Sequence, residues 1–144
     1  MALLKAARSA QWPLVSTFKF DITDTFVDIN GVTKSFKDAA PVFDVINLPV
    51  GAIVVGGQMQ VTTQSDETGT ATLKIGDSVS DSRYLTATSI KSAAATALTT
   101  TGYEPAGLNI RITLANQNAN ATAGTVRINV FFILPNRANE VYPV

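Results

Sequence analysis

The sequence predicts a single all-β domain, a sandwich or barrel of about eight short antiparallel strands. Three observations predict it. Apolar and polar residues alternate with a period of two through most of the chain, as they do in strands with one buried face. Turn-forming residues recur roughly every 8–12 positions. No segment carries the pattern of a long helix, and 144 residues is the ordinary size of one domain.

The first predicted strands lie between residues 15 and 36. In residues 18–22 (FKFDI), Phe and Ile alternate with Lys and Asp, which indicates one buried face. Residues 26–29 and 32–36 flank Asn30-Gly31. This dipeptide is a strong two-residue turn signal, because Asn and Gly tolerate positive φ. We therefore expect a chain reversal there.

The middle of the chain predicts three further strands. Residues 43–49 (FDVINLP) form one that we expect to end at Pro49. Residues 51–63 form the next, interrupted by Gly56-Gly57. A double glycine inside a strand indicates a bulge or a close backbone approach. In residues 71–75, Ala, Leu and Ile alternate with Thr and Lys until Gly76-Asp77 ends the strand.

The last third holds two clear strands after an ambiguous stretch. Residues 77–85 are rich in Ser and Asp and predict turns. Residues 86–98 are open between a helical turn, favoured by alanine, and a strand, favoured by threonine. Residues 108–114 and 126–132 alternate strictly. In the second of these, Phe131 and Phe132 must lie on opposite faces.

These patterns divide the chain into three parts. Residues 1–14 read as an N-terminal arm, because Pro13 prevents a helix from continuing and the preceding segment is too short to be stable alone. Residues 15–134 form the β domain. Residues 135–144 form a polar C-terminal tail.

The chain is poor in charge: charged residues make up 15%, and the net charge is zero, against about 25% charged residues in ordinary domains. Such a surface is either covered by other protein chains or solvated by Thr, Ser, Asn and Gln. No basic stripe is present, which argues against nucleic acid. Apolar runs are far shorter than the roughly 18 residues of a membrane span. The N-terminal segment lacks the apolar core of a signal peptide.

The chain contains no Cys and no His. Their absence excludes thiolate nucleophiles, imidazole metal ligands and Ser-His-Asp catalysis. Paired carboxylates are the remaining acid–base chemistry, but most acids adjoin Gly, Thr or Ser and read as turn residues. Asp77, Asp81 and Arg83 fail the EF-hand template, so we expect Arg83 to pair with one of the two acids. The sequence therefore predicts no enzyme, no cofactor and no metal.

The most distinctive surface candidates lie near the two ends of the chain. The arm combines Leu3 and Leu4 with Lys5, Arg8 and Trp12. It is either a loose end whose Trp covers a nearby apolar edge or a segment that orders on a partner, since Trp and Arg dominate interface energetics. The outward side chain of Phe131 either packs beneath the arm or joins a subunit contact. The candidate partner and subunit contacts are Leu3, Leu4, Lys5, Arg8, Trp12, Phe131 and Tyr142.

Three stretches of the sequence, residues 43–63, 73–94 and 102–133, resemble a group of small tailed-phage virion proteins. The shared order is "strand–LP-G–strand–GG–strand", then "GD…RYL", then "G–NIR–L…TAG–V". The resemblance covers about residues 40–134 and leaves out the N-terminal 35. The group looks like capsid decoration, or cement, proteins. It implies a single jelly-roll-like β-sandwich with extended N- and C-terminal arms, and assembly as homotrimers on the capsid surface.

The resemblance implies the major capsid protein and further copies of this chain as partners, and a place on the virion surface after synthesis in the host cytoplasm. Two alternatives stay open. One is a carbohydrate- or receptor-binding module of a phage tail or fibre, with a groove lined by Tyr84, Tyr103 or Tyr142. The other is a jelly-roll coat subunit of a small virus, although the arm holds only Lys5 and Arg8 as basic residues.

Overall fold

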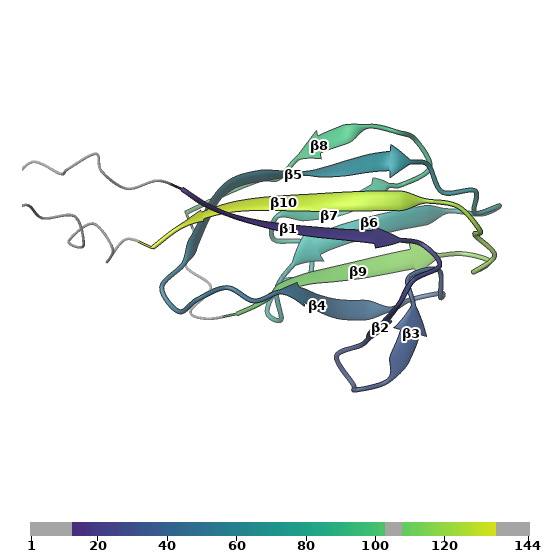
Figure 1. The fold of residues 1–144 in the computed structure, drawn as a ribbon, viewed down its shortest axis with the longest axis horizontal. Coiled ribbons are helices and arrows are strands. Elements are labelled where there is room, and N and C mark those ends of the chain that lie inside the picture. Colours follow the sequence, from purple (N-terminus) through teal and green to yellow (C-terminus); the bar gives the residue numbers. More distant parts are fainter. Residues whose placement is uncertain (1–12, 103–107, 135–144) are drawn as a thin grey trace, which may run out of the picture.

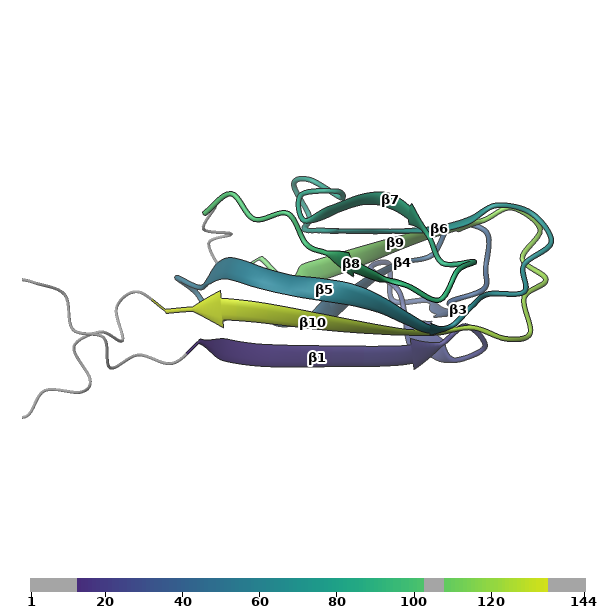
Figure 2. The same cartoon turned by 90° about the horizontal axis from the view of Figure 1, so that it is seen from above.

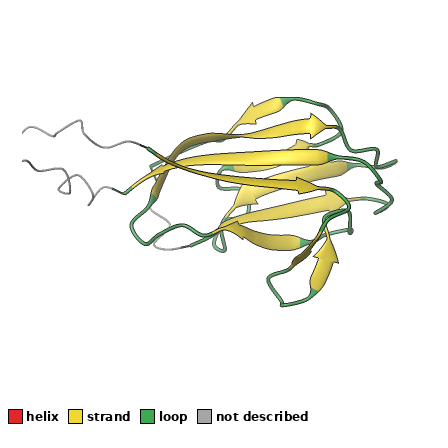
Figure 3. Ribbon diagram, in the orientation of Figure 1, coloured by secondary structure: helices red, strands yellow, loops and turns green. Residues whose placement is uncertain are grey.

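The computed structural model describes residues 13–102 and 108–134. Ten strands and no helix occur in these two ranges (Figure 3). Within them, nothing helical has the length and apolar character needed to cross a membrane. The strands are β1 (Leu14–Asp21), β2 (Thr25–Val27), β3 (Thr33–Ser35), β4 (Val42–Ile46), β5 (Ile53–Thr63), β6 (Ala71–Gly76), β7 (Leu85–Ser89), β8 (Ala95–Ala97), β9 (Ile110–Asn116) and β10 (Thr125–Ile133).

Eight of the strands form two four-stranded antiparallel sheets that face each other (Figures 1 and 2). The first has the order β1-β10-β5-β8 and the second β4-β9-β6-β7. The pairs β1–β10, β4–β9, β5–β8 and β6–β7 are nested one inside the next along the chain, as when a long hairpin is rolled up. This nesting is the order of a jelly roll. The predicted jelly-roll-like sandwich is therefore confirmed.

Strands β2 and β3 form a separate hairpin between β1 and β4 that projects beside the second sheet (Figure 1). Its turn contains the predicted Asn30-Gly31, and Gly31 has φ +78°. The ten strands exceed the predicted eight because β7 and β8 lie in a stretch that the sequence left open between helix and strand. Residues 86–98 resolve as the short strands β7 and β8, so threonine and sheet pairing outweigh the helix propensity of alanine.

The predicted irregularity at Gly56-Gly57 is confirmed in both forms. The register between β10 and β5 shifts between Phe131 and Phe132, opposite Gly56, which is a bulge. A Cβ at Gly57 would lie 2.2 Å from the carbonyl oxygen of Asn129, a close backbone approach. The strand predicted over residues 43–49 ends earlier than expected, at Ile46, because its β9 partner begins at Ile110.

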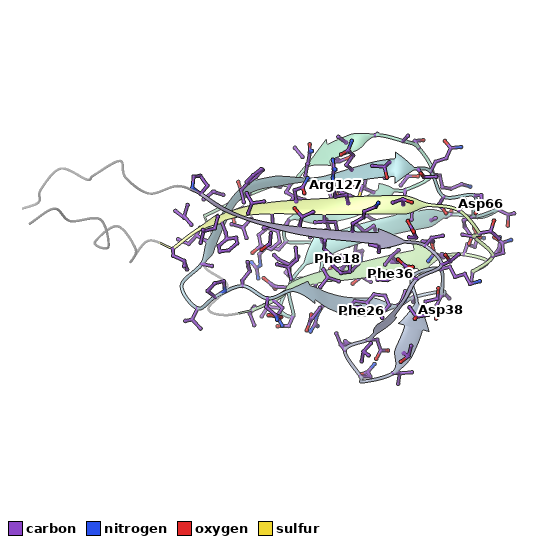
Figure 4. All side chains as sticks on the ribbon, in the orientation of Figure 1. Phe18, Phe26, Phe36, Asp38, Asp66 and Arg127 are labelled. Carbon is purple, nitrogen blue, oxygen red and sulfur yellow. The ribbon has the colours of Figure 1, made fainter. Side chains whose placement is uncertain are left out.

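The core fills the space between the two sheets. Alternate residues of the central strands are fully buried, as the period-two pattern predicted. An aromatic cluster closes one side: the rings of Phe20 and Phe36 stack with centroids 4.2 Å apart, and Phe36 also contacts Phe43 at 4.6 Å. Phe26 of β2 joins Phe18 at 5.8 Å (Figure 4). This cluster anchors the hairpin on the sandwich.

Candidate assembly surfaces

Phe131 is the one predicted contact residue that lies in the described ranges. Its side chain is 40% exposed on the outer face of the first sheet, while Phe132 is buried. It lies opposite Val15, which is 54% exposed, and over Gly56. Val55, in the bulge, is also exposed. We call Val15, Val55 and Phe131 the terminal patch. Leu3, Leu4, Lys5, Arg8, Trp12 and Tyr142 lie outside the described residues.

The terminal patch lies at the end of the sandwich where β1 begins and β10 ends, since Leu14 pairs with Phe132. Farther along the same face the side chains are polar. Thr17 Oγ1 donates to Asn129 Oδ1 at 2.9 Å, and Arg127 donates to Gln60 Oε1. This face is therefore solvated by amides and hydroxyls, which is one of the two explanations for the low charge.

A second apolar surface, which the sequence did not single out, lies on the β2–β3 hairpin. Phe26, Val27, Ile29 and Val32 are between 38% and 54% exposed; we call them the hairpin patch. One signal could have revealed it. Two adjacent apolar residues, Phe26 and Val27, cannot both face a core in a strand, so one must point outward.

Asp28 holds the hairpin in shape. Its carboxylate accepts backbone N–H groups from Asn30 at 2.8 Å and Val32 at 2.9 Å, and Lys34 lies 3.5 Å away. The Val32 bond, followed by those of Asn30 and Lys34, lowers the pKa of Asp28 against the opposing effect of burial. These contacts of Asp28 therefore stabilise the turn that presents the hairpin patch.

The acids that we read as turn residues have structural roles. Glu67 is buried and accepts backbone N–H groups from Gly69, Asn118 and Asn120. Burial raises its pKa, but these three bonds outweigh it and the pKa is lowered. Asp66 accepts the Thr122 hydroxyl at 2.5 Å and two backbone N–H groups. Together they tie the loop after β5 to the loop before β10.

Arg83 pairs with Asp77, as predicted: its Nε lies 2.5 Å from Asp77 Oδ2. Asp77 is buried and also accepts the N–H groups of Val79 and Ser80. Burial raises the pKa of Asp77, but the bonds from Arg83 and the two N–H groups outweigh burial, so the pKa is lowered. Asp81 pairs instead with Lys74 at 3.0 Å. Residues 13–102 and 108–134 hold no group of three acids that could bind a metal ion.

The carbohydrate-binding alternative predicts that Tyr84 lines a surface groove, and this prediction is wrong. That side chain is 2% exposed, because its ring packs in the core cluster between the two sheets. Tyr103 and Tyr142 lie outside the described residues. A depression of about 520 Å³ beside β9 has no aromatic lining residue; it is lined by Ala39, Thr70, Ala115, Asn116 and Gln117. This depression therefore offers no ring for stacking against a sugar.

No family model matches this chain, and no curated protein matches its sequence. Solved structures do match its fold. A chain of the cyanophage Pam1 capsid asymmetric unit is 27% identical, with a TM-score of 0.60 over 93% of this chain and 94% of that chain. A chain of the acidic stable capsid structure of Helicobacter pylori bacteriophage KHP30 is 16% identical, with a TM-score of 0.61 over 87% and 90%.

A chain in the capsid of Ralstonia phage GP4 is 15% identical and has a TM-score of 0.52 over 92% of this chain and 88% of that chain. The last two likenesses concern the fold alone. In all three cases nearly the whole of each chain is aligned. The complete sandwich is therefore shared with chains of phage capsid structures.

Proposed function

We propose that this protein is a structural virion protein, a decoration or cement protein that binds the outer surface of a phage head and stabilises it as a homotrimer. Its partners are the major capsid protein and further copies of itself. The protein is made in the host cytoplasm and ends on the virion surface. It acts by burying surface rather than by chemistry, so it has no catalytic residue and no cofactor.

The observation that carries this proposal is the likeness to a chain of the cyanophage Pam1 capsid at 27% identity over 93% of the sequence. The likeness covers 93% of this chain and 94% of that chain, so it concerns the β-sandwich as a unit. Because one fold can serve unrelated functions, the surface of this chain must supply the rest of the argument.

The surface supports an assembling protein. Two apolar patches, the terminal patch and the hairpin patch, lie on a surface that is low in charge. Two further exposed apolar side chains, Val50 and Val79, lie outside both patches. Contiguous exposed apolar side chains mark interaction sites, and the centres of interfaces are depleted in charge. The two patches occupy different parts of the sandwich, since one lies at the start of β1 and the other on the β2–β3 hairpin (Figure 1). Two patches allow one contact with the capsid and another between subunits.

The terminal patch fits the contact residues inferred from sequence. Residues 1–12 precede β1, and residues 135–144 follow β10, so both segments are joined to the sandwich beside Val15 and Phe131. We propose that Leu3, Leu4 and Trp12 bury apolar surface on the capsid while Lys5 and Arg8 contact carbonyl or carboxylate oxygens. Phe131 and Tyr142 complete the contacts, either with the capsid or with a neighbouring subunit. Trp and Arg are the residue types that most often dominate such interfaces.

A second candidate function is a coat subunit that builds the shell itself, because the matching structures are described as capsids. One experiment separates the two. Phage heads are assembled without this protein, and the purified chain is added afterwards. A decoration protein binds the finished shell to saturation and raises its resistance to heat. If no shell forms without this chain, the protein is a coat subunit.

A further inference from the structure

The outer edge of β1 is an open strand edge. β1 is the first strand of the order β1-β10-β5-β8, and no strand of the described chain lies on its other side (Figure 2). Its eight residues pair with β10 without a register shift, from Leu14↔Phe132 to Asp21↔Thr125. The edge is therefore straight and long enough to accept another strand.

The hydrogen bonds at the end of β1 show which backbone groups face outward. Asp21 N–H donates to Asp24 Oδ2, and the Asp21 carbonyl accepts from the Asp24 N–H; both bonds lie away from β10. Ile22 N–H points the other way, to Gly124 beside β10. Because these groups alternate along a strand, the N–H and C=O groups of Val15, Thr17 and Lys19 also face away from β10.

This edge lacks the usual protection against strand addition. Natural edges are blunted by proline, bulges, short length or several charges. Between Leu14 and Asp21 there is no proline and no bulge, and Lys19 is the only basic residue. The loop that contains Asp24 covers this edge only at its Asp21 end. The side chains of Val15, Thr17 and Lys19 are exposed on the outer face, so an added strand would meet an apolar, a hydroxyl and a cationic side chain in turn.

We propose that the C-terminal segment of a second copy of this chain adds to this edge as an antiparallel strand, with Glu140 opposite Lys19, Tyr142 opposite Thr17 and Val144 opposite Val15. This inference rests on the proposed function, in which the chain works as an assembly of identical copies. Opposite charges, an aromatic beside a β-branched residue, and two apolar residues are all favourable cross-strand pairs. The resulting contact is head-to-tail, and three such contacts form a closed trimer when the rotation between neighbouring copies closes the ring.

Charge selects the C-terminal segment over the N-terminal one. Residues 1–12 contain Lys5 and Arg8 and no acid, so they would set like charges or neutral residues against Lys19. Glu140 is the acid of residues 135–144. The pairing also accommodates Pro143. In this register the backbone N–H and C=O groups of residues 140, 142 and 144 face β1. Residue 143 faces away from β1, where an edge strand tolerates a proline without an N–H.

The length of the chain makes the donor a neighbouring copy. β10 ends at Ile133, near the start of β1. For the Glu140 of the same copy to reach Lys19, the seven residues after Ile133 would have to pass to the outer edge of β1 and run about 20 Å along it. The chain would then have to reverse direction to pair antiparallel. Seven fully extended residues reach only about 24 Å, which leaves no chain for the reversal. A neighbouring copy, whose β10 can end near the Asp21 end of this β1, has no such limit.

A cross-link tests the register. The chain has no cysteine, so Thr17→Cys with Tyr142→Cys introduces one possible pair. Directly opposed, hydrogen-bonded residues have Cα atoms about 5.5 Å apart, within the range of a disulfide. After mild oxidation we expect covalent oligomers on a denaturing gel. The control pair, Thr17→Cys with Val141→Cys, should link poorly, because residue 141 faces the opposite side. Equal linking of both pairs, or fast-migrating internally linked monomers, would overturn the proposal.

A charge swap gives an independent readout. Lys19→Glu and Glu140→Lys should each raise the dissociation constant of the oligomer, by roughly threefold to tenfold per contact, and the double variant should restore it. Light scattering during size-exclusion chromatography measures this without capsids. If wild type binds heads but neither swap nor cross-link behaves as expected, the strand pairing is wrong and the decoration role stands. If the chains pair in this way but heads are not bound, the pairing stands and the decoration role fails.

Discussion

The backbone of Gly57 lies so close to Asn129 on the neighbouring strand that a Cβ at residue 57 would sit 2.2 Å from the Asn129 carbonyl oxygen. Gly57 has φ +139°, a conformation that is essentially confined to glycine. This contact lies beside the bulge that places Phe131 on the outer face and Phe132 in the core. The double glycine thus sets the geometry of the terminal patch.

We predict that Gly57→Ala lowers the free energy of unfolding by roughly 2–4 kcal/mol, because the new methyl group meets backbone and not a movable side chain. The matched control is Gly56→Ala. A Cβ there would lie 3.6 Å from the ring of Phe131, an ordinary contact, so the change should stay within about 0.5 kcal/mol. Urea unfolding of both variants checks this. Equal effects would contradict the close approach.

The pair Arg83–Asp77 predicts a second difference in stability. Arg83→Met leaves the buried Asp77 carboxylate without its cation, and we expect a loss of about 2 kcal/mol, less than the roughly 3–5 of a fully buried pair because the Arg83 side chain keeps 18% exposure. Lys74→Met breaks the exposed pair with Asp81 and should cost below about 1 kcal/mol. A larger loss for Lys74→Met in thermal unfolding would contradict this account.

Asp66 predicts a loss of stability in acid. The Thr122 hydroxyl, then the N–H groups of Ala123 and Thr122, lower its pKa from 3.8 to about 2. A carboxyl whose folded pKa is depressed stabilises the fold above its unfolded pKa, and this contribution disappears as the pH falls through the folded pKa. Stability should therefore fall between about pH 4 and pH 2. Asp66→Asn should be less stable at pH 7 and should show a flatter profile in that window, as measured by urea midpoints at each pH.

The N-terminal arm predicts an effect on binding without an effect on folding. Deleting residues 1–12 leaves β1 complete, because it begins at Leu14. We expect capsid affinity to fall at least about tenfold, since the loss of a buried Trp anchor alone commonly costs more than 1.4 kcal/mol. The unfolding midpoint should not change. Val79→Ala, at a 73% exposed position far along the chain, is the control and should bind as wild type does. Unchanged binding by the deleted chain would remove the arm from the contact.

The sequence was sufficient to predict the sandwich, since period-two alternation identifies strands whose inner faces are fully buried, as at Ile110, Ile112 and Leu114. It also predicted the irregularity at Gly56-Gly57 and the turn at Asn30-Gly31. The pairing order of the strands could not be predicted from periodicity, because alternation fixes which face is buried and not which strand is the neighbour.

The candidate surfaces were predicted less completely. Phe131 could be identified because it adjoins Phe132 in an alternating strand. The hairpin patch was missed because Phe26 and Ile29 have the composition of core residues. Only the position of the hairpin outside both sheets exposes them. Tyr84 was assigned to a groove because tyrosine is common at both surfaces and cores, and its sequence neighbours do not separate the two.

The central claim is that this chain decorates a phage head, and electron cryo-microscopy of heads to which the purified protein has been added tests it most directly. The account predicts extra density on the outer surface, in clusters of three sandwiches, with the termini of each sandwich at a protein contact. Heads that bind none of the added protein, or density for this chain only within the continuous shell, would contradict it.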